Sequence, residues 1–204
     1  MLTQCLSIPH ISTGDMLRDR IHRGVAKSSV VESMQSGALV SDEVVNRIVA
    51  ERLGQPDASG GFVLDGYPRT LQQAEHLKSW LDERGTHELV IHLEVDYNII
   101  VNRLTGRREC PRCGTLYNLA YRPPKVDEIC DLDGEKLIVR NDDREDVIRE
   151  RLEAYENQTR PVLEFYRGTG GCVVNVDASN DPPDRVFDKI WQAIKQDDCS
   201  KNGR

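Results

Sequence analysis

Residues 62–73 read FVLDGYPRTLQQ, so that a buried strand, a tight turn and the start of a helix follow one another directly. The first three residues form a short apolar run of the kind that a strand covered on both faces requires. Two similar runs, at 89–95 and 172–176, are each flanked by helical patterns. Strands that alternate with helices in this way predict an α/β fold, with a parallel sheet flanked by helices.

Four helices are predicted from apolar residues that recur at helical spacing. One runs from Thr70, a good N-cap, to a stop near Gly85. The others begin at Ser41, at the acidic pair 142–143 and after the proline pair 182–183. Because acidic residues and prolines suit the first turn of a helix, we place helix starts at these points.

The turn after the first predicted strand lies where open α/β sheets bind ligands, outside the carboxyl ends of the strands. It begins with Asp65. Gly66 would let a ligand approach the backbone, and Arg69 is placed where a phosphate could lie. Gln73 allows a second interpretation, because Thr70 and Gln73 have the spacing of a capping box. In a capping box the glutamine amide only satisfies the helix start.

The stretch 105–143 lacks helical periodicity and is too long for an ordinary loop. Within it, Cys110 and Cys113 form one pair with a two-residue gap, and Cys130 and Asp133 form a second. Two such pairs can close a tetrahedron around one zinc ion, with a carboxylate oxygen as the fourth ligand. Four protein ligands leave no open position, so the zinc would be structural and would hold a small β-rich insertion. The alternative is three free thiols beside an incidental aspartate.

The chain is acidic, with a net charge of −7 and a pI of about 5.3, which argues against a general nucleic-acid binder. No stretch has the apolar length of a membrane span, and the first residues do not resemble a signal peptide. We therefore expect a cytoplasmic protein with no membrane partner. Four arginines between 103 and 112 stand out against the acidic balance. They suit an anionic small ligand, or else a solvated helix end.

Three short strings contain arginines, and each string alone is weak evidence for a ligand site. Residues 11–18, ISTGDMLR, predict a helix cap and then an arginine that could simply be solvated. Arg103 and Arg107 have the spacing of one helical face and would point together. Arg140 opens the string RNDD, and Arg151 follows on the next predicted helix. Their order along the chain, with the cysteine insertion among them, is more specific than any one string.

Taken in order, these strings resemble the adenylate kinase family in its long-lid, zinc-bearing form. The match is carried by ISTGDMLR, LDGYPRT, GRRECPRCGTLYN, RPPK, ICDLDG and RNDD, and it runs from about Ile8 to Ile194. The resemblance implies a P-loop-kinase-like parallel sheet, a helical AMP-binding insert and a small zinc lid. By this resemblance the core is 1–11, 41–105 and 144–204, the insert is 12–40 and the lid is 106–143.

The same resemblance implies reversible phosphoryl transfer between ATP and AMP, with magnesium and with ADP as the product, in a protein that we expect to be a monomer. Arg69 would contact the AMP phosphate and Gln73 the adenine edge. The full AMP set would be Thr13, Arg18, Ala38, Leu39, Val40, Gly66, Arg69, Gln73, Arg140 and Arg151. The ATP set would be Arg103, Arg107, Leu116, Tyr117 and Asn180. The catalytic set would be Arg69, Arg107, Arg140 and Arg151, with Asp65 orienting magnesium-bound water.

The N-terminal end departs from the family pattern, in which a strand, a G-x-x-x-x-G-K-S/T phosphate loop and a helix come first. Only ten residues precede Ile11, and they contain neither glycine nor lysine. We therefore expect the first strand and the P-loop to be absent, and these 204 residues to have little or no kinase activity. Alternatively, the sequence begins at a downstream methionine of a longer, intact enzyme.

Two further hypotheses remain. The acceptor could be another nucleoside monophosphate, although Thr13 and Gln73 are placed as in adenylate kinases and favour AMP. Or the chain could be a catalytically inactive, zinc-stabilised remnant that binds AMP or a partner protein.

Overall fold

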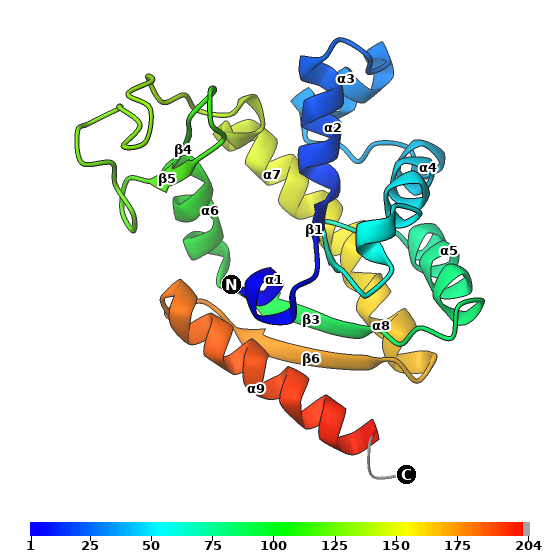
Figure 1. Ribbon diagram of the computed structural model, residues 1–204. Helices are drawn as coiled ribbons and strands as arrows, with labels where there is room; N and C mark the ends of the chain where they lie inside the picture. Colours follow the sequence, from blue (N-terminus) through cyan, green and yellow to red (C-terminus); the bar gives the residue numbers. More distant parts are fainter. Residues whose placement is uncertain (202–204) are drawn as a thin grey trace.

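The computed structural model describes residues 1–201, with side chains described as far as residue 196, and it has the predicted α/β organisation (Figure 1). The strands are β1 (His10–Ser12), β2 (Val63–Asp65), β3 (Leu89–Glu94), β4 (Arg107–Glu109), β5 (Leu116–Asn118) and β6 (Cys172–Asp177). The helices are α1 (Leu2–Leu6), α2 (Thr13–His22), α3 (Ser28–Ser36), α4 (Asp42–Leu53), α5 (Leu71–Asp82), α6 (Tyr97–Thr105), α7 (Glu145–Ala154), α8 (Arg160–Gly168) and α9 (Pro183–Lys201). Shorter elements are the 3-10 turns η1 (Pro56–Ala58) and η2 (Asn141–Asp143) and the π-helical turn η3 (Tyr155–Thr159).

The parallel strands form two separate pairs. β1 lies beside β2, with Ile11 opposite Leu64, and β3 lies beside β6 over their whole length. The three strands predicted from apolar runs are thereby confirmed as β2, β3 and β6. β1 was missed because its three residues include only one apolar side chain. Within residues 1–201, no ladder joins β2 to β3, so helix packing must connect the two pairs.

Helix α5 makes that connection. Its residues Leu77 and Leu81 belong to the buried cluster around Ile11 of β1. Ala74, one turn earlier, packs with Val162 of α8 in the cluster that lies beside β3 and β6. Each fully buried leucine or isoleucine side chain contributes about 1.5–3 kcal/mol. The start of α5, where the predicted ligand turn ends, is therefore held firmly against both strand pairs.

Helices α7 and α8 form one helical path that passes from the end of segment 106–143 toward the strands (Figure 1). Pro161, at the start of α8, has no backbone N–H, and its ring crowds the preceding turn, which accounts for the π-turn η3 just before it. Thr159, at the end of η3, donates a hydrogen bond to the carbonyl of Arg69 at 3.0 Å. Arg151 lies on α7, before the π-turn. This path therefore holds two of the predicted site arginines in a common frame.

The predicted pairing of Arg103 and Arg107 on one helical face is wrong. α6 ends at Thr105, so Arg107 lies in strand β4. The carbonyl of Gly106 accepts a hydrogen bond from the Leu119 N–H at 2.9 Å, and the chain enters the antiparallel segment 106–143 here instead of continuing the helix.

The predicted start of α7 at Asp142 and Asp143 is also wrong. Both residues lie in η2, and α7 begins at Glu145, with Arg144 as its N-cap. The reason is a tertiary contact. Arg151 donates to the Asp142 carbonyl at 2.9 Å and to the Asp143 carboxylate at 3.3 Å, which draws this segment inward.

Segment 106–143, all of which is described, contains no α-helix, and its strands pair in antiparallel orientation. β4 pairs with β5, with Arg108 opposite Tyr117. Isolated bridges extend the pattern, for example between Ile129 and Lys136. Figure 1 shows this segment projecting beyond the end of α6, away from β3 and β6. Among residues 1–201, no helix is long and apolar enough to cross a membrane.

Candidate functional site

Three arginines from separate segments meet at two neighbouring carboxylates. Arg107 of β4 and Arg151 of α7 both donate to Asp143, at 2.7 Å from Arg107 Nε and 3.3 Å from Arg151 Nη1. Arg18 of α2 and Arg151 lie 3.7 and 3.6 Å from Asp142 Oδ2. The Asp143 side chain is fully buried. The sequence brings these arginines from three distant positions into one place.

Arg69 joins this group from the turn before α5, where three contacts fix it. Its N–H donates to Gln73 Oε1 at 2.7 Å, its carbonyl accepts from Thr159, and its Nε donates to the Gly66 carbonyl at 2.9 Å. Among the described residues, neither terminal nitrogen of Arg69 has a hydrogen-bond partner. The backbone and Nε are thus held while two N–H₂ groups remain for an anion.

The electrostatics of this cluster favour an anionic ligand. Burial lowers the pKa of Arg69 from its ordinary value, and the neighbouring charges of Arg151 and Arg18 lower it further. Burial likewise lowers the pKa of Arg151, with a further contribution from Arg107. Guanidinium groups held this close repel one another, and a phosphate that accepted bonds from several of them would relieve the repulsion.

Gly66 is required at its position. It adopts a φ of 74°, and a Cβ there would lie 3.0 Å from Thr13 Oγ1 and 2.9 Å from Arg69 Nη2. Thr13 is buried, and its hydroxyl donates to the Gly66 carbonyl at 2.8 Å. The predicted AMP residues Thr13, Gly66 and Arg69 therefore lie in direct contact. Asp65, beside them, is exposed, with one carboxylate oxygen 3.4 Å from His10 Nε2.

The rest of the predicted AMP set is less closely grouped. Ala38 is exposed, Leu39 is half-buried and Val40 is buried in the core around β1. Arg140 forms a paired contact with Glu109 of β4, at 2.5 and 3.1 Å. That contact joins the two ends of segment 106–143 and occupies the guanidinium with a protein carboxylate.

The predicted ATP residues fall into two groups. Arg103 donates to the Ser179 carbonyl at 3.0 Å, which places it beside the exposed Asn180. Leu116 is exposed on β5, whereas Tyr117 is only 4% exposed and packs with Cys110, Cys130 and Leu137. The Tyr117 hydroxyl contacts Cys130 Sγ at 3.5 Å and accepts a hydrogen bond from the Asp131 N–H. Only the backbone of Tyr117 is left to flank a base.

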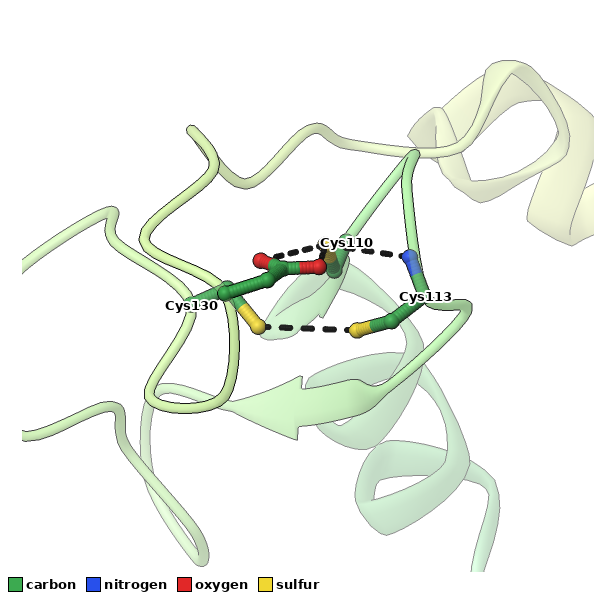
Figure 2. Close-up of side chains that lie close together, drawn as sticks. Cys110, Cys113 and Cys130 are labelled. Carbon is green, nitrogen blue, oxygen red and sulfur yellow. Dashed lines mark hydrogen bonds between the residues drawn. The ribbon is translucent and has the colours of Figure 1, made fainter.

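The four predicted metal ligands are brought together. The side chains of Cys110, Cys113 and Cys130 converge between two loops (Figure 2), and with Asp133 they offer ligand atoms that all lie within 4.8 Å of one another. Cys110 Sγ is 3.4 Å from both oxygens of Asp133, and Cys113 Sγ is 3.6 Å from Cys130 Sγ. Three sulfurs and one carboxylate form a donor set that zinc accepts, so the residues present fit the predicted metal.

Two matching backbone turns build this cluster. The Gly114 N–H donates to the Cys110 carbonyl at 2.9 Å, and the Gly134 N–H donates to the Cys130 carbonyl at 3.0 Å. Both glycines have positive φ, 71° and 72°. The Glu135 N–H donates to Asp133 and lowers the pKa of that carboxyl to about 2, so the carboxylate is available as a ligand.

Comparison with known proteins identifies the family. The model of the family described as adenylate kinase matches residues 1–171. The chain belongs to the adenylate kinase family. The adenylate kinase of Oceanobacillus iheyensis is 47% identical over 191 residues, which cover 93% of this chain and 86% of the relative. The adenylate kinase of Caldanaerobacter subterraneus subsp. tengcongensis is 45% identical over 193 residues, with the same two coverages. That of Moorella thermoacetica is 44% identical over 198 residues, covering 96% of this chain and 90% of the relative.

In this adenylate kinase family member, Gln73 is held within the protein. Its side-chain carbonyl accepts from the Arg69 N–H, and its Nε2 donates to Asp42 Oδ1 at 2.7 Å. The predicted helix cap is confirmed, because the Gln73 N–H donates to Thr70 Oγ1 at 3.2 Å. The amide, however, contacts the residue before the cap and a second helix, which a local capping box does not include.

Sequence reasoning missed the residues that hold the arginines in place. Asp42, Glu109 and Thr159 each bind a predicted site residue through contacts between positions 31 to 90 apart in the sequence. No local motif marks them. The acidic pair 142–143 also holds Arg151, and it belongs to the arginine-bearing string RNDD, but on its own the pair predicts a helix start.

Proposed function

We propose that this protein is a nucleoside monophosphate kinase that catalyses reversible phosphoryl transfer between ATP and AMP. The observation that carries the proposal is the meeting of Arg18, Arg69, Arg107 and Arg151 around one region, with the free N–H₂ groups of Arg69 facing no protein acceptor among the described residues. In phosphoryl transfer, charge spreads over three oxygens, so catalysis is mainly positioning and cationic stabilisation.

The arginines divide by the segment that carries them. Arg69 would hold the AMP phosphate, because Gly66 and Thr13 lie beside it and leave room for close approach. Arg107 and Arg140 are at the base of the lid, where closure would bring them to the transferring group together with Arg151. Their present partners, Glu109 and Asp143, would have to share them with phosphate oxygens.

We assign the core to residues 1–11, 41–105 and 144–204, of which 202–204 lie outside the described residues, the AMP insert to 12–40 and the lid to 106–143. Closure of the lid would exclude water that otherwise hydrolyses the donor. Arg103 and Asn180 would lie on the ATP side. Zinc, when bound by Cys110, Cys113, Cys130 and Asp133, would supply the cross-link that keeps this small segment folded. Magnesium would enter with ATP, with Asp65 orienting its water.

A second candidate function is binding of AMP without turnover. The observation that favours it is the direct contact of three proposed AMP residues, Thr13, Gly66 and Arg69, at one preformed turn. Binding of AMP requires only this site, whereas turnover also requires ATP. A cytoplasmic location and a monomeric state remain predictions.

The test is a coupled assay of ADP formation from ATP, AMP and magnesium, with AMP binding measured separately by calorimetry on the same 204-residue chain. AMP binding without turnover would support the second candidate. Turnover at an ordinary kinase rate would support the kinase and would mean that another segment replaces the phosphate loop. Equal turnover with CMP or UMP would remove the preference for AMP as acceptor. No binding of any nucleotide would contradict both candidates.

A further inference from the structure

The start of α4 and the start of α5 meet in a polar network centred on Asp42. Thr70 Oγ1 donates to Asp42 Oδ2, and Gln73 Nε2 donates to Asp42 Oδ1, both at 2.7 Å. Close by, the Tyr67 hydroxyl donates to Asn46 Oδ1 at 2.7 Å and lies 3.3 Å from the Gln73 carbonyl. One carboxylate oxygen of Asp42 therefore accepts a hydrogen bond from Thr70, the N-cap of α5, and the other accepts one from the Gln73 side chain.

This network allows only one orientation of the Gln73 amide. An aspartate carboxylate only accepts hydrogen bonds, and a backbone N–H only donates them. The amide nitrogen must therefore face Asp42, and the amide oxygen must face the Arg69 N–H, 2.7 Å away. The reverse orientation would place oxygen against oxygen and N–H against N–H. Because Thr70 also holds the carboxylate, Asp42 cannot turn away to accommodate it.

The fixed amide retains one unused hydrogen on Nε2 and one unused lone pair on Oε1. Adenine matches this pattern, because its N6 amino group donates and its N1 accepts. The 6-oxopurines hypoxanthine and guanine present the reverse, an accepting O6 and a donating N1–H. An amide that cannot turn over would therefore accept the first base and reject the other two.

We propose that Asp42 is a positioning residue that makes this site select adenine over 6-oxopurines, by holding the Gln73 amide in one orientation. The inference rests on the proposed function and on the expected contact between Gln73 and the base. Gln73 is only 2% exposed, so AMP binding must displace part of what covers the amide. The network itself would persist, because its members Asp42 and Thr70 are at the starts of two core helices.

The test compares AMP with IMP, its 6-oxo counterpart, by calorimetry on the full chain. Asp42→Asn replaces an acceptor by a side chain that can donate or accept, and so removes half of the constraint. We expect the ratio of AMP affinity to IMP affinity to fall by about tenfold, the effect of one favourable pairing lost and one clash relieved. Both affinities are measured on one preparation, so a partly unfolded fraction cancels in the ratio.

Three comparisons separate this role from a structural one. Asp82→Asn, an exposed aspartate at the other end of α5, should leave the ratio unchanged. In a Gln73→Ala background, Asp42→Asn should cause no further change in the ratio, because the amide through which it acts is gone. Should Asp42→Asn fail to fold, Thr70→Val removes the second support of Asp42 and should move the ratio in the same direction.

Equal loss of AMP and IMP affinity in Asp42→Asn, or the same change in the Gln73→Ala background, would overturn the assignment. A wild-type chain that bound neither nucleotide would overturn the proposed function, and this inference with it. A wild-type chain that bound AMP and IMP equally would overturn this inference alone.

Discussion

Arg107 hydrogen-bonds both carboxylate oxygens of Asp143, 36 positions further along the chain, and these two residues stand at the two ends of segment 106–143, the proposed lid. This ion pair joins the beginning of the segment to its end. Because Asp143 also accepts a hydrogen bond from Arg151, this ion pair connects segment 106–143 to α7. The contact therefore has a structural consequence and a functional one.

Asp143→Ala should destabilise the protein by about 3 kcal/mol, because it leaves Arg107 and Arg151 without their buried partner. Denaturant unfolding followed by circular dichroism measures this. Asp146→Ala is the matched control, since its carboxylate is exposed and its one ion-pair partner among the described residues is the exposed Arg144. If Asp143→Ala lowers the free energy of unfolding no more than the control does, the Arg107–Asp143 ion pair does not stabilise the protein.

Arg69→Ala should weaken AMP binding by about 1.5–3 kcal/mol, the contribution of a charge-assisted contact to phosphate. Adenosine, which has no phosphate, should bind with unchanged affinity. Arg167→Ala, an exposed arginine on α8, provides the control. An Arg69→Ala protein with wild-type affinity for AMP would place Arg69 outside the binding site.

Removal of the metal should loosen the lid. After chelation, limited proteolysis should cut faster within 106–143, while cleavage elsewhere keeps its rate. Cys113→Ser should behave like the chelated protein, since it removes one of four ligands from the cluster. Metal analysis should find about one zinc per chain in the untreated protein. Cleavage of the lid that chelation leaves unaltered would contradict a structural metal.

Gly66→Ala should cost more than the strain of its positive φ alone, which is about 1–2 kcal/mol. The added Cβ would also press against Thr13 Oγ1 and Arg69 Nη2, and AMP affinity should fall as well. Gly85→Ala is the matched comparison, because Gly85 also has positive φ but nothing lies within 4 Å of the position. Equal destabilisation by the two substitutions would mean that the contact at Gly66 relaxes without cost.

Local sequence patterns correctly predicted the elements that are specified by residues close together in the chain. The apolar runs identified β2, β3 and β6, and Thr70 caps α5 through the contact that its spacing indicated. The spacing of the three cysteines and Asp133 predicted that they would meet, and they do. In each case the residues involved are near in sequence, or their spacing repeats a known turn that includes a glycine.

Boundaries were predicted poorly where a long-range contact competes with a local preference. The acidic residues Asp142 and Asp143 favour a helix start in isolation, yet Arg107 and Arg151 draw them out of one. Arg107 has helical spacing from Arg103, yet the lid begins between them. Leaving the buried Asp143 carboxylate unpaired would cost about 3–5 kcal/mol. That is more than the few tenths of a kcal/mol that one residue's helix preference contributes.

The sequence alone determined the family, the α/β organisation, the turn after β2 and the composition of the cysteine–aspartate cluster, because strings of adjacent residues encode each of these. The tertiary structure alone decided which arginines share a carboxylate, that Gln73 hydrogen-bonds both Asp42 and Arg69, and that the Tyr117 hydroxyl contacts Cys130 of the cluster. Those relationships join residues far apart in the chain. Their geometry depends on how helices pack against the strands, and no local spacing contains that information.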